Sequence, residues 1–121
     1  MHKVFGGVEG GGTKFVCVLG TGPGQVVDEL RFATTTPDET LGRVVAFFRR
    51  PRSDVHLAAV GVASFGPIDL DPASPTYGHV TTTPKPYWPG TDVVGILRET
   101  EADVVGARHR RVPGRDVKRL R

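Results

Sequence analysis

The stretch VEGGGTKFVCVLG, residues 8–20, places three glycines and a threonine between two apolar segments. Residues 4–9 and 15–19 are rich in β-branched and apolar side chains, and a glycine-rich break between two such segments is typical of a β-hairpin. A second turn, GTGPG at 20–24, precedes QVVDELRFATTT at 25–36, whose alternation predicts a third strand. The beginning of the chain is therefore expected to form an antiparallel three-stranded meander.

The segment TTTPDETLGRVVAFF, which follows the meander, carries the signals of a helix start. Thr36 and Glu39 have the spacing of a capping box, and Pro37 occupies the first helical position, where its missing N–H costs nothing. The apolar residues that follow are spaced along one helix face: Leu41, Val44, Val45 and Phe48. Arg49 and Arg50 end the pattern with the charge that suits a helix C-terminus. The pattern predicts a helix over 37–49.

The second half of the chain contains less regular structure. The apolar run HLAAVGVA, 56–63, predicts a buried strand, and TDVVGILRE, 91–99, predicts a short helix capped by Thr91. Between them, residues 64–90 include six prolines and form a long loop, whose aromatic residues argue against disorder. The predicted order β-β-β-α-β-loop-α indicates a mixed α/β fold.

The glycine turn at 10–12 has two interpretations. Without Cβ atoms, its backbone N–H groups can converge on an anion; Lys14 would add a charge and Thr13 a hydroxyl, while Glu9 could hold a magnesium ion through water. The spacing of a P-loop is absent, and no GxGxxG precedes a helix. On these grounds alone, the turn is either a phosphate-binding turn or a plain tight hairpin.

The loop after the predicted strand 56–63 has further candidate residues. It begins with Ser64 and Gly66, where α/β folds often place a ligand-facing loop. The side chains of Asp69 and Asp71 are either paired catalytic carboxylates or, as we expect, part of a solvated edge. Lys85 is held between two prolines, and Trp88 is either a platform for a sugar ring or a core residue beneath the loop. His56 and His79 lack metal-ligand spacing.

Composition limits the class of protein. The 121 residues suit one domain, and the chain has no apolar run long enough for a membrane span and no signal-peptide core, so we expect a cytoplasmic protein that does not bind membranes. The single cysteine, Cys17, is expected to be buried in a strand.

The charge is unevenly distributed along the chain. Residues 103–121 hold seven basic and two acidic side chains, which leaves nine basic and eleven acidic side chains for residues 1–102. Such a basic tail raises the alternative of a nucleic-acid-binding module.

The blocks GGVEGGGTKFVC, ATTTPDETL and GVASFGPIDLDPASPTYGHVTTTPKPYWPGTD together resemble the N-terminal part of bacterial fructokinases of the ROK family, from about Phe5 to Leu97. The resemblance implies the N-terminal domain of the actin-like ATPase (ribonuclease H-like) sugar kinase fold, in truncated form. It implies phosphorylation of a hexose, most simply fructose, by ATP with Mg²⁺, with a ROK glucokinase or another hexose kinase as the alternative. Full-length members of this family are expected to be homodimers.

The resemblance also assigns residues. Those matching the ATP phosphate motif are Gly10, Gly11, Gly12, Thr13 and Lys14, with Glu9 at the acidic position that a magnesium ion would approach through water. Those matching the sugar cleft are Ser64, Phe65, Gly66, Lys85, Pro86 and Trp88. No catalytic residue is assigned, because the family's general base lies in a later segment resembling Asp-Thr-Asp-Val-Asn.

In place of that later segment the chain has ARHRRVPGRDVKRLR, 107–121. Arg108-His109-Arg110-Arg111 can be encoded as CGA CAC CGA CGT, which, read from its second nucleotide and with a following G, becomes GAC ACC GAC GTG, or Asp-Thr-Asp-Val. We therefore expect two parts, a partial kinase domain over 1–102 and a basic non-matching tail over 103–121, and hypothesise that the tail is frameshifted. The expected consequence is an inactive fragment. A DNA-binding helix-turn-helix is not expected, because the first predicted strand begins close to Met1.

Overall fold

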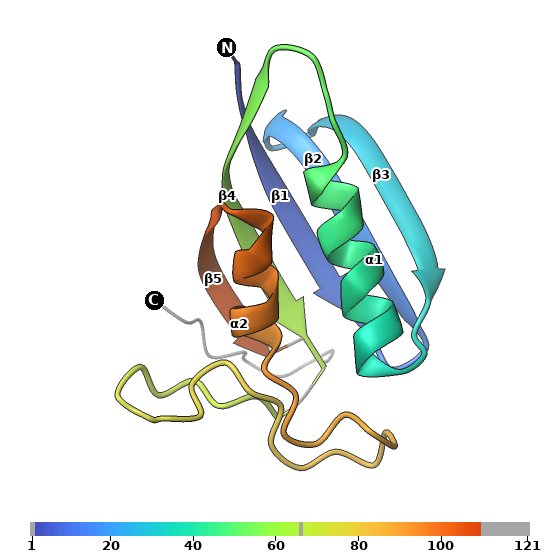
Figure 1. The fold of residues 1–121 in the computed structure, drawn as a ribbon, viewed down its shortest axis with the longest axis vertical. Helices are drawn as coiled ribbons and strands as arrows, with labels where there is room; N and C mark the ends of the chain where they lie inside the picture. The colour runs from blue at the N-terminus through green and yellow to red at the C-terminus, as the bar shows by residue number, and fades with distance from the viewer. Residues whose placement is uncertain (1, 66, 110–121) are drawn as a thin grey trace.

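The computed structural model describes residues 2–65 and 67–109. Its elements follow the order strand, strand, strand, helix, strand, helix, strand (Figure 1). Their bounds are β1 His2–Gly10, β2 Lys14–Gly22, β3 Gln25–Ala33, α1 Pro37–Arg49, β4 Val55–Ser64, α2 Val93–Leu97, a 3₁₀ turn η1 Arg98–Thr100, and β5 Asp103–His109. The predicted α/β class and the predicted order of the first six elements are confirmed.

The five strands form one mixed sheet in the order β3-β2-β1-β4-β5. β1, β2 and β3 are antiparallel neighbours, which confirms the meander, while β4 and β5 run parallel to β1 on its other side. The third strand ends at Ala33 rather than at residue 36, because the Thr34 amide already bonds to the Thr13 carbonyl, 2.9 Å away, and Thr36 caps the helix.

The helix α1 has the predicted bounds. The hydroxyl of Thr36 accepts a hydrogen bond from the Glu39 amide at 3.4 Å, and Pro37 is the first helical residue. The Glu39 carboxylate accepts from the Thr35 hydroxyl at 2.7 Å, so the predicted pair takes part in a wider network at the helix start. The residues that α1 buries against the sheet are Thr40, Leu41, Val44, Phe47 and Phe48.

The predicted cap of the second helix was wrong. Asp92, not Thr91, caps α2, and its carboxylate accepts from the Gly95 amide at 2.8 Å. The chain is still extended at this point, because Asp92 forms an isolated bridge with His79 and the Thr91 carbonyl accepts from Val80. The helix can therefore begin only at Val93, and it ends at Leu97 before the 3₁₀ turn.

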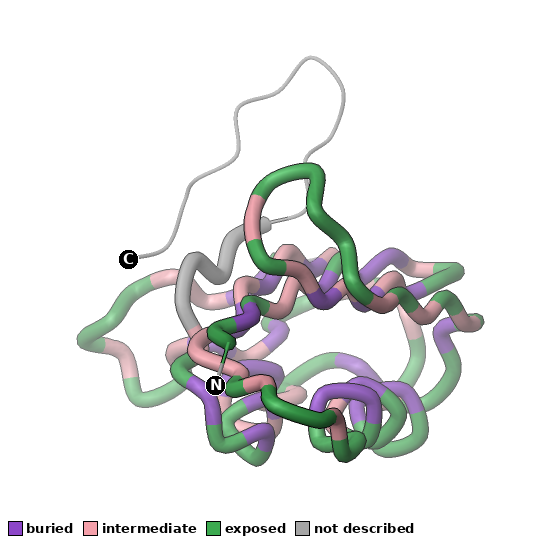
Figure 2. The backbone as a smooth tube through the Cα atoms, turned by 90° about the horizontal axis from the view of Figure 1, so that it is seen from above, coloured by how far each residue is buried: buried purple, intermediate pink, exposed green. Residues whose placement is uncertain are grey.

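The core lies between the sheet and the two helices, which cover the same face (Figure 2). Cys17 is completely buried there, as predicted, and burial raises the pKa of its thiol to about 12. The fifth strand pairs with β4, so the sheet continues past residue 102, where the sequence placed a domain boundary. Most of the basic tail, from residue 110, lies outside the described residues.

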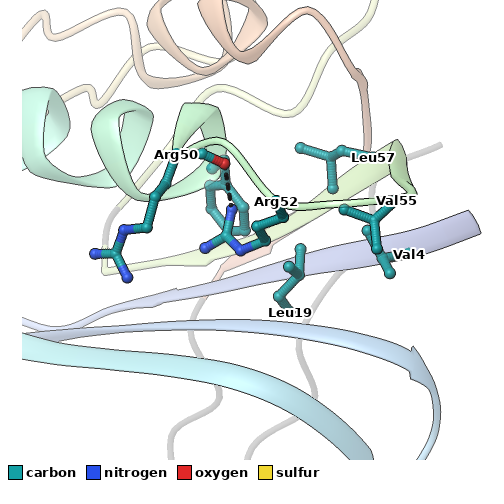
Figure 3. Close-up of a pocket in the computed structure, with 7 residues that line it drawn as sticks. Val4, Leu19, Arg50, Arg52, Val55 and Leu57 are labelled. Carbon is teal, nitrogen blue, oxygen red and sulfur yellow. Dashed lines mark hydrogen bonds between the residues drawn. The ribbon is translucent and has the colours of Figure 1, made fainter.

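Asp28, Arg50 and Arg52 form a cluster of charged side chains near the end of the sheet where β1 begins. Asp28 on β3 accepts from Arg52 at 3.0 Å and from Arg50 at 3.4 Å, and Arg52 also donates to the carbonyl of Arg50 at 3.1 Å. These arginines border a small pocket of about 90 Å³ (Figure 3), whose apolar lining is Val4, Leu19, Phe48, Val55 and Leu57. Asp28 thus ties an edge strand to the connection between α1 and β4.

The Asp28 cluster predicts a small acid sensitivity. The hydrogen bond from Arg52 is the main cause that holds the pKa of Asp28 below its ordinary value. A lowered folded-state pKa means that the stabilisation is complete above the unfolded-state pKa, near 4, and is lost as pH falls through the lower folded-state value. Asp28→Asn should therefore cost at most about 1 kcal/mol at pH 7, because the pair is solvated. Urea unfolding at pH 7 and pH 3 measures this; an equal cost at both values would contradict it.

Candidate functional site

The glycine turn and the loop after β4 lie at the same edge of the sheet. β1 and β4 are parallel, with Gly10 opposite Ser64, and the Phe65 amide donates to the Gly10 carbonyl at 2.8 Å. Figure 1 shows both strands ending at this edge, with the long loop beneath them. Ligands of open α/β sheets bind outside the carboxyl ends of such strands. Two motifs more than 50 residues apart in the sequence therefore belong to one candidate site.

The turn itself is held by hydrogen bonds that leave part of its backbone available. The Gly11 amide donates to the Lys14 carbonyl at 2.8 Å, and the Gly11 carbonyl accepts from the Thr34 hydroxyl at 2.7 Å. Within residues 2–65 and 67–109, the amides of Gly12 and Thr13 have no hydrogen-bond acceptor. With the exposed Lys14 beside them, these two N–H groups can receive an anion.

Gly10 has a different role from that of its neighbours. It is buried, and a Cβ atom at this position would lie 2.6 Å from the ring of Phe15. At Gly12, by contrast, a Cβ atom would meet nothing within 4 Å. Gly10 is therefore needed for packing behind the turn, whereas Gly12 lies where a phosphate could approach.

The predicted cleft residue Ser64 faces the protein interior. It is 2% exposed, and its hydroxyl donates to the Phe65 carbonyl at 2.8 Å. Phe65 is half-buried and packs edge-on against Trp88, with ring centroids 5.1 Å apart. Gly66 lies outside the described residues. The backbone after β4, more than the Ser64 side chain, borders the edge where a ligand would bind.

Trp88 is a core residue, the second of the two interpretations that the sequence left open. Its side chain is completely buried, stacked on Phe15 with ring centroids 5.8 Å apart. The indole N–H donates to the Thr35 carbonyl at 2.9 Å, which joins the proline-rich loop to the start of α1. Because the Trp88 side chain is completely buried, its ring has no exposed surface on which a sugar could stack.

The exposed aromatic residue of the proline-rich segment is Tyr87, which sequence reasoning did not select. It is 80% exposed and adopts a φ of 72°, a conformation that is uncommon for a bulky side chain. Its neighbour Pro86 is also exposed, and Lys85 is half-buried. The available signal was the pair of adjacent aromatics, of which only one can enter the core. Tyr87 therefore joins Lys85 and Pro86 as a candidate for contact with a ligand.

Asp69 and Asp71 organise the first part of the loop. Asp69 accepts from the hydroxyls of Ser74 and Thr76, both at 2.6 Å, and from the Asp71 amide at 3.0 Å. The Ser74 hydrogen bond is the main cause that lowers the pKa of Asp69. Asp71 in turn accepts from the Ala73 amide at 2.9 Å. Both carboxylates thus act as turn-forming acceptors on a solvated edge, the interpretation that the sequence favoured.

Glu9 is the carboxylate nearest in sequence to the turn. It is exposed and, by the alternation of a strand, lies on the opposite side of β1 from Gly10. Among the residues that the structure describes, no three or more His, Cys, Asp or Glu side chains form a metal site. A single carboxylate still fits Mg²⁺, which is commonly held by one or two carboxylates, water and the phosphates of a substrate.

The arrangement has the fold of ROK sugar kinases, which is an actin-like ATPase fold. A ROK glucokinase from Streptomyces griseus, solved in complex with glucose and AMPPNP, superposes with a TM-score of 0.66 at 20% identity, over 84% of this chain and 32% of that one. A ROK hexokinase from Thermus thermophilus gives a TM-score of 0.65 at 18% identity, over 88% of this chain and 35% of that one.

Sequence comparison then gives the family. The ROK family model matches residues 5–108, so this chain belongs to the ROK family. It is 50% identical to a fructokinase of Streptococcus mutans over 97 residues, which are 80% of this chain and 32% of that protein. It is 46% identical to a fructokinase of Zymomonas mobilis over 114 residues, with coverage of 87% and 38%. The chain therefore spans about a third of the length of these relatives.

No helix in the described ranges 2–65 and 67–109 is both long enough and apolar enough to cross a bilayer.

Proposed function

We propose that this domain forms the part of an ATP-dependent hexose kinase that binds phosphate, with fructose as the sugar. The observation that carries the proposal is the turn at the carboxyl edge of the sheet, where the amides of Gly12 and Thr13, which have no acceptor in the part of the chain that the structure describes, lie next to Lys14. The similarity to curated fructokinases, at 46–50% identity in the two proteins compared above, supports fructose over glucose.

In this proposal the turn stabilises charge on the transferred phosphate. The N–H groups of Gly12 and Thr13 would donate to phosphate oxygens, and the Lys14 ammonium would neutralise part of their charge. Glu9 would hold Mg²⁺ through water, and the ion would supply charge neutralisation when bound. The loop bearing Lys85, Pro86 and Tyr87 would border the sugar.

The proposal separates phosphate binding from turnover. In the described site Asp69 and Asp71 serve as turn acceptors, and the chain spans only about a third of the length of its relatives. Part of a kinase would not exclude water or enclose a nucleotide. We propose that the chain alone binds ATP weakly and does not phosphorylate sugars.

Binding is tested by titrating the ¹⁵N-labelled chain with Mg-ATP and following its amide signals. We expect the largest shifts at Gly12, Thr13 and Lys14. Lys14→Ala should weaken binding about tenfold or more, because a hydrogen bond to a charged group contributes roughly 1.5–3 kcal/mol. Lys3→Ala is the matched control, since Lys3 is also exposed but lies near the start of β1, whereas the turn follows the end of that strand. Equal weakening by both variants, or shifts confined to other residues, would contradict the proposed phosphate site.

Turnover is tested by coupled ADP release with fructose, glucose and mannose. The chain alone is compared with a chimera in which it replaces the 97 matching residues of the Streptococcus mutans fructokinase. The chimera should phosphorylate fructose and the chain alone should not. Preference for glucose in the chimera would instead favour the glucokinase alternative.

A further inference from the structure

The strand β3 forms an edge of the sheet whose outer side is open. The order β3-β2-β1-β4-β5 leaves it paired with β2 alone, and no other strand of the described residues lies beyond it (Figure 1). It is nine residues long and contains neither proline nor lysine, two residues that commonly protect edge strands from pairing with another chain. The outer side of β3 can therefore accept a further strand.

The pairing of β3 with β2 shows which of its backbone groups face outward. The Thr34 amide donates to the Thr13 carbonyl at 2.9 Å, and hydrogen-bonded pairs alternate with non-bonded pairs along an antiparallel ladder. The register is regular from Ala33 back to residue 28, so this alternation continues along the strand. It directs the N–H and C=O groups of Glu29, Arg31 and Ala33 away from β2, toward the open side.

The side chains at the centre of this edge carry opposite charges two positions apart. Glu29 and Arg31 lie on the same face of the strand, with 42% and 60% of their side chains exposed, and their Oε1 and Nη2 atoms are 3.1 Å apart. Between them, Leu30 is half-buried on the opposite face. The sequence Glu-Leu-Arg becomes Arg-Leu-Glu when it is read in the opposite direction. An antiparallel second copy centred on Leu30 would therefore place Glu29 opposite Arg31 twice.

We propose that β3 is a homodimerisation edge, at which two copies of this chain pair antiparallel about Leu30 and join their sheets into one. Residues that face outward can bond only to residues that face outward, so the register can shift only in steps of two. A shift of two in either direction places Glu29 opposite Glu29 or Arg31 opposite Arg31. Like charges directly opposite each other are destabilising, which leaves the register centred on Leu30 as the favoured one.

One contact within the single chain competes with this pairing. The outward amide of Glu29 donates to the Asp28 carboxylate at 2.9 Å, and that carboxylate is held in place by Arg52 and Arg50. In the dimer the Glu29 amide would instead donate to the Arg31 carbonyl of the second copy. Because one hydrogen bond is exchanged for another, we expect a reversible, concentration-dependent dimer.

Sedimentation equilibrium of the chain over a wide range of concentrations tests the proposal. Arg31→Glu and Glu29→Arg should each raise the dimer dissociation constant about tenfold or more, because each places like charges opposite each other at two symmetric contacts. The double variant exchanges the charges and should restore the dissociation constant of the wild type. A mixture of the two single variants should associate more tightly than either variant alone.

The matched controls are Arg98→Glu and Glu99→Arg. Both residues are exposed and lie in η1, which precedes the opposite edge strand, β5. They make the same changes in net charge as the variants of β3 and should leave the dissociation constant unchanged. A weakening by the controls equal to that by the β3 variants would overturn the proposal.

Oxidative crosslinking tests the register. Leu30→Cys should form a disulfide-linked dimer, because a residue opposite its own copy in a non-bonded pair has a Cα separation of about 4.5 Å, which a disulfide can span. Ala33→Cys is the control, since its two copies would lie roughly 20 Å apart along the strands. The native Cys17 is completely buried.

Three results would contradict the homodimerisation edge. They are a chain that stays monomeric at every concentration, a dimer that charge reversal does not weaken, and crosslinking of Ala33→Cys in preference to Leu30→Cys. The charge variants change only exposed side chains, so they remain informative if Leu30→Cys does not fold. The proposal does not rest on the kinase function, because every measurement reports association alone.

Discussion

Trp88→Ala is expected to lower the free energy of unfolding by about 3–5 kcal/mol, the range for removing a large aromatic residue from a core. Trp88 is completely buried, and its ring contacts both Phe15 and Phe65. The substitution would also leave the Thr35 carbonyl without the indole donor that now lies 2.9 Å away. For a domain of this size such a loss is a large part of the total stability.

Urea unfolding followed by far-ultraviolet circular dichroism measures the effect of Trp88→Ala, since the variant has no tryptophan fluorescence. Trp88→Phe should retain part of the packing and lose the hydrogen bond, and so fall between the wild type and the alanine variant. The matched control is Tyr87→Ala, which removes the adjacent exposed aromatic and should change stability by no more than about 0.5 kcal/mol. A loss from Tyr87→Ala as large as that from Trp88→Ala would show that the loop packs differently.

Gly10→Ala should destabilise the domain by about 1–3 kcal/mol, as overpacking in a core commonly does. The added methyl would lie 2.6 Å from the ring of Phe15. That ring cannot easily move away, because it stacks on both Phe32 and Trp88, with centroid distances of 6.1 and 5.8 Å. The strain would therefore be shared by the centre of the core.

Gly12→Ala is the control for Gly10→Ala, because a Cβ atom there meets nothing within 4 Å. Its stability should change by no more than about 0.5 kcal/mol. The double variant Gly10→Ala with Phe15→Leu tests the cause directly: if the ring is the obstacle, its cost should be smaller than the sum of the two single costs. Simple additivity would mean that Gly10 is required for another reason.

Local signals predicted the regular elements well. The bounds of α1 agree at both ends, because Thr36, Pro37 and the apolar spacing all specify the same helix. The order and pairing of the meander also follow from short-range features, namely two glycine-rich turns between apolar segments. The cap of α2 was missed by one residue, since a bridge between His79 and Asp92 keeps the chain extended, and that bridge joins residues 13 apart.

The candidate site was only partly predictable. The sequence singled out the glycine turn and the loop after β4, and the resemblance to ROK fructokinases led to the expectation that both belong to one site. It could not assign separate roles to neighbouring glycines, because Gly10 and Gly12 differ in what lies across the fold from them. Nor could it choose between Tyr87 and Trp88, two adjacent aromatics of which one is buried and one exposed.

The stretch VEGGGTKFVCVLG by itself determined a hairpin with a glycine turn before Lys14, because turn geometry and strand alternation depend on neighbours in the chain. Only the tertiary structure decided that this turn meets the loop after β4, that Gly10 makes room for Phe15, and that Trp88 closes the core behind both. The first and the last of these outcomes depend on parallel pairing and on side-chain packing between residues more than 50 positions apart. The contact between Gly10 and Phe15 is local in the sequence. Even that contact is constrained by Trp88, whose position the fold alone establishes.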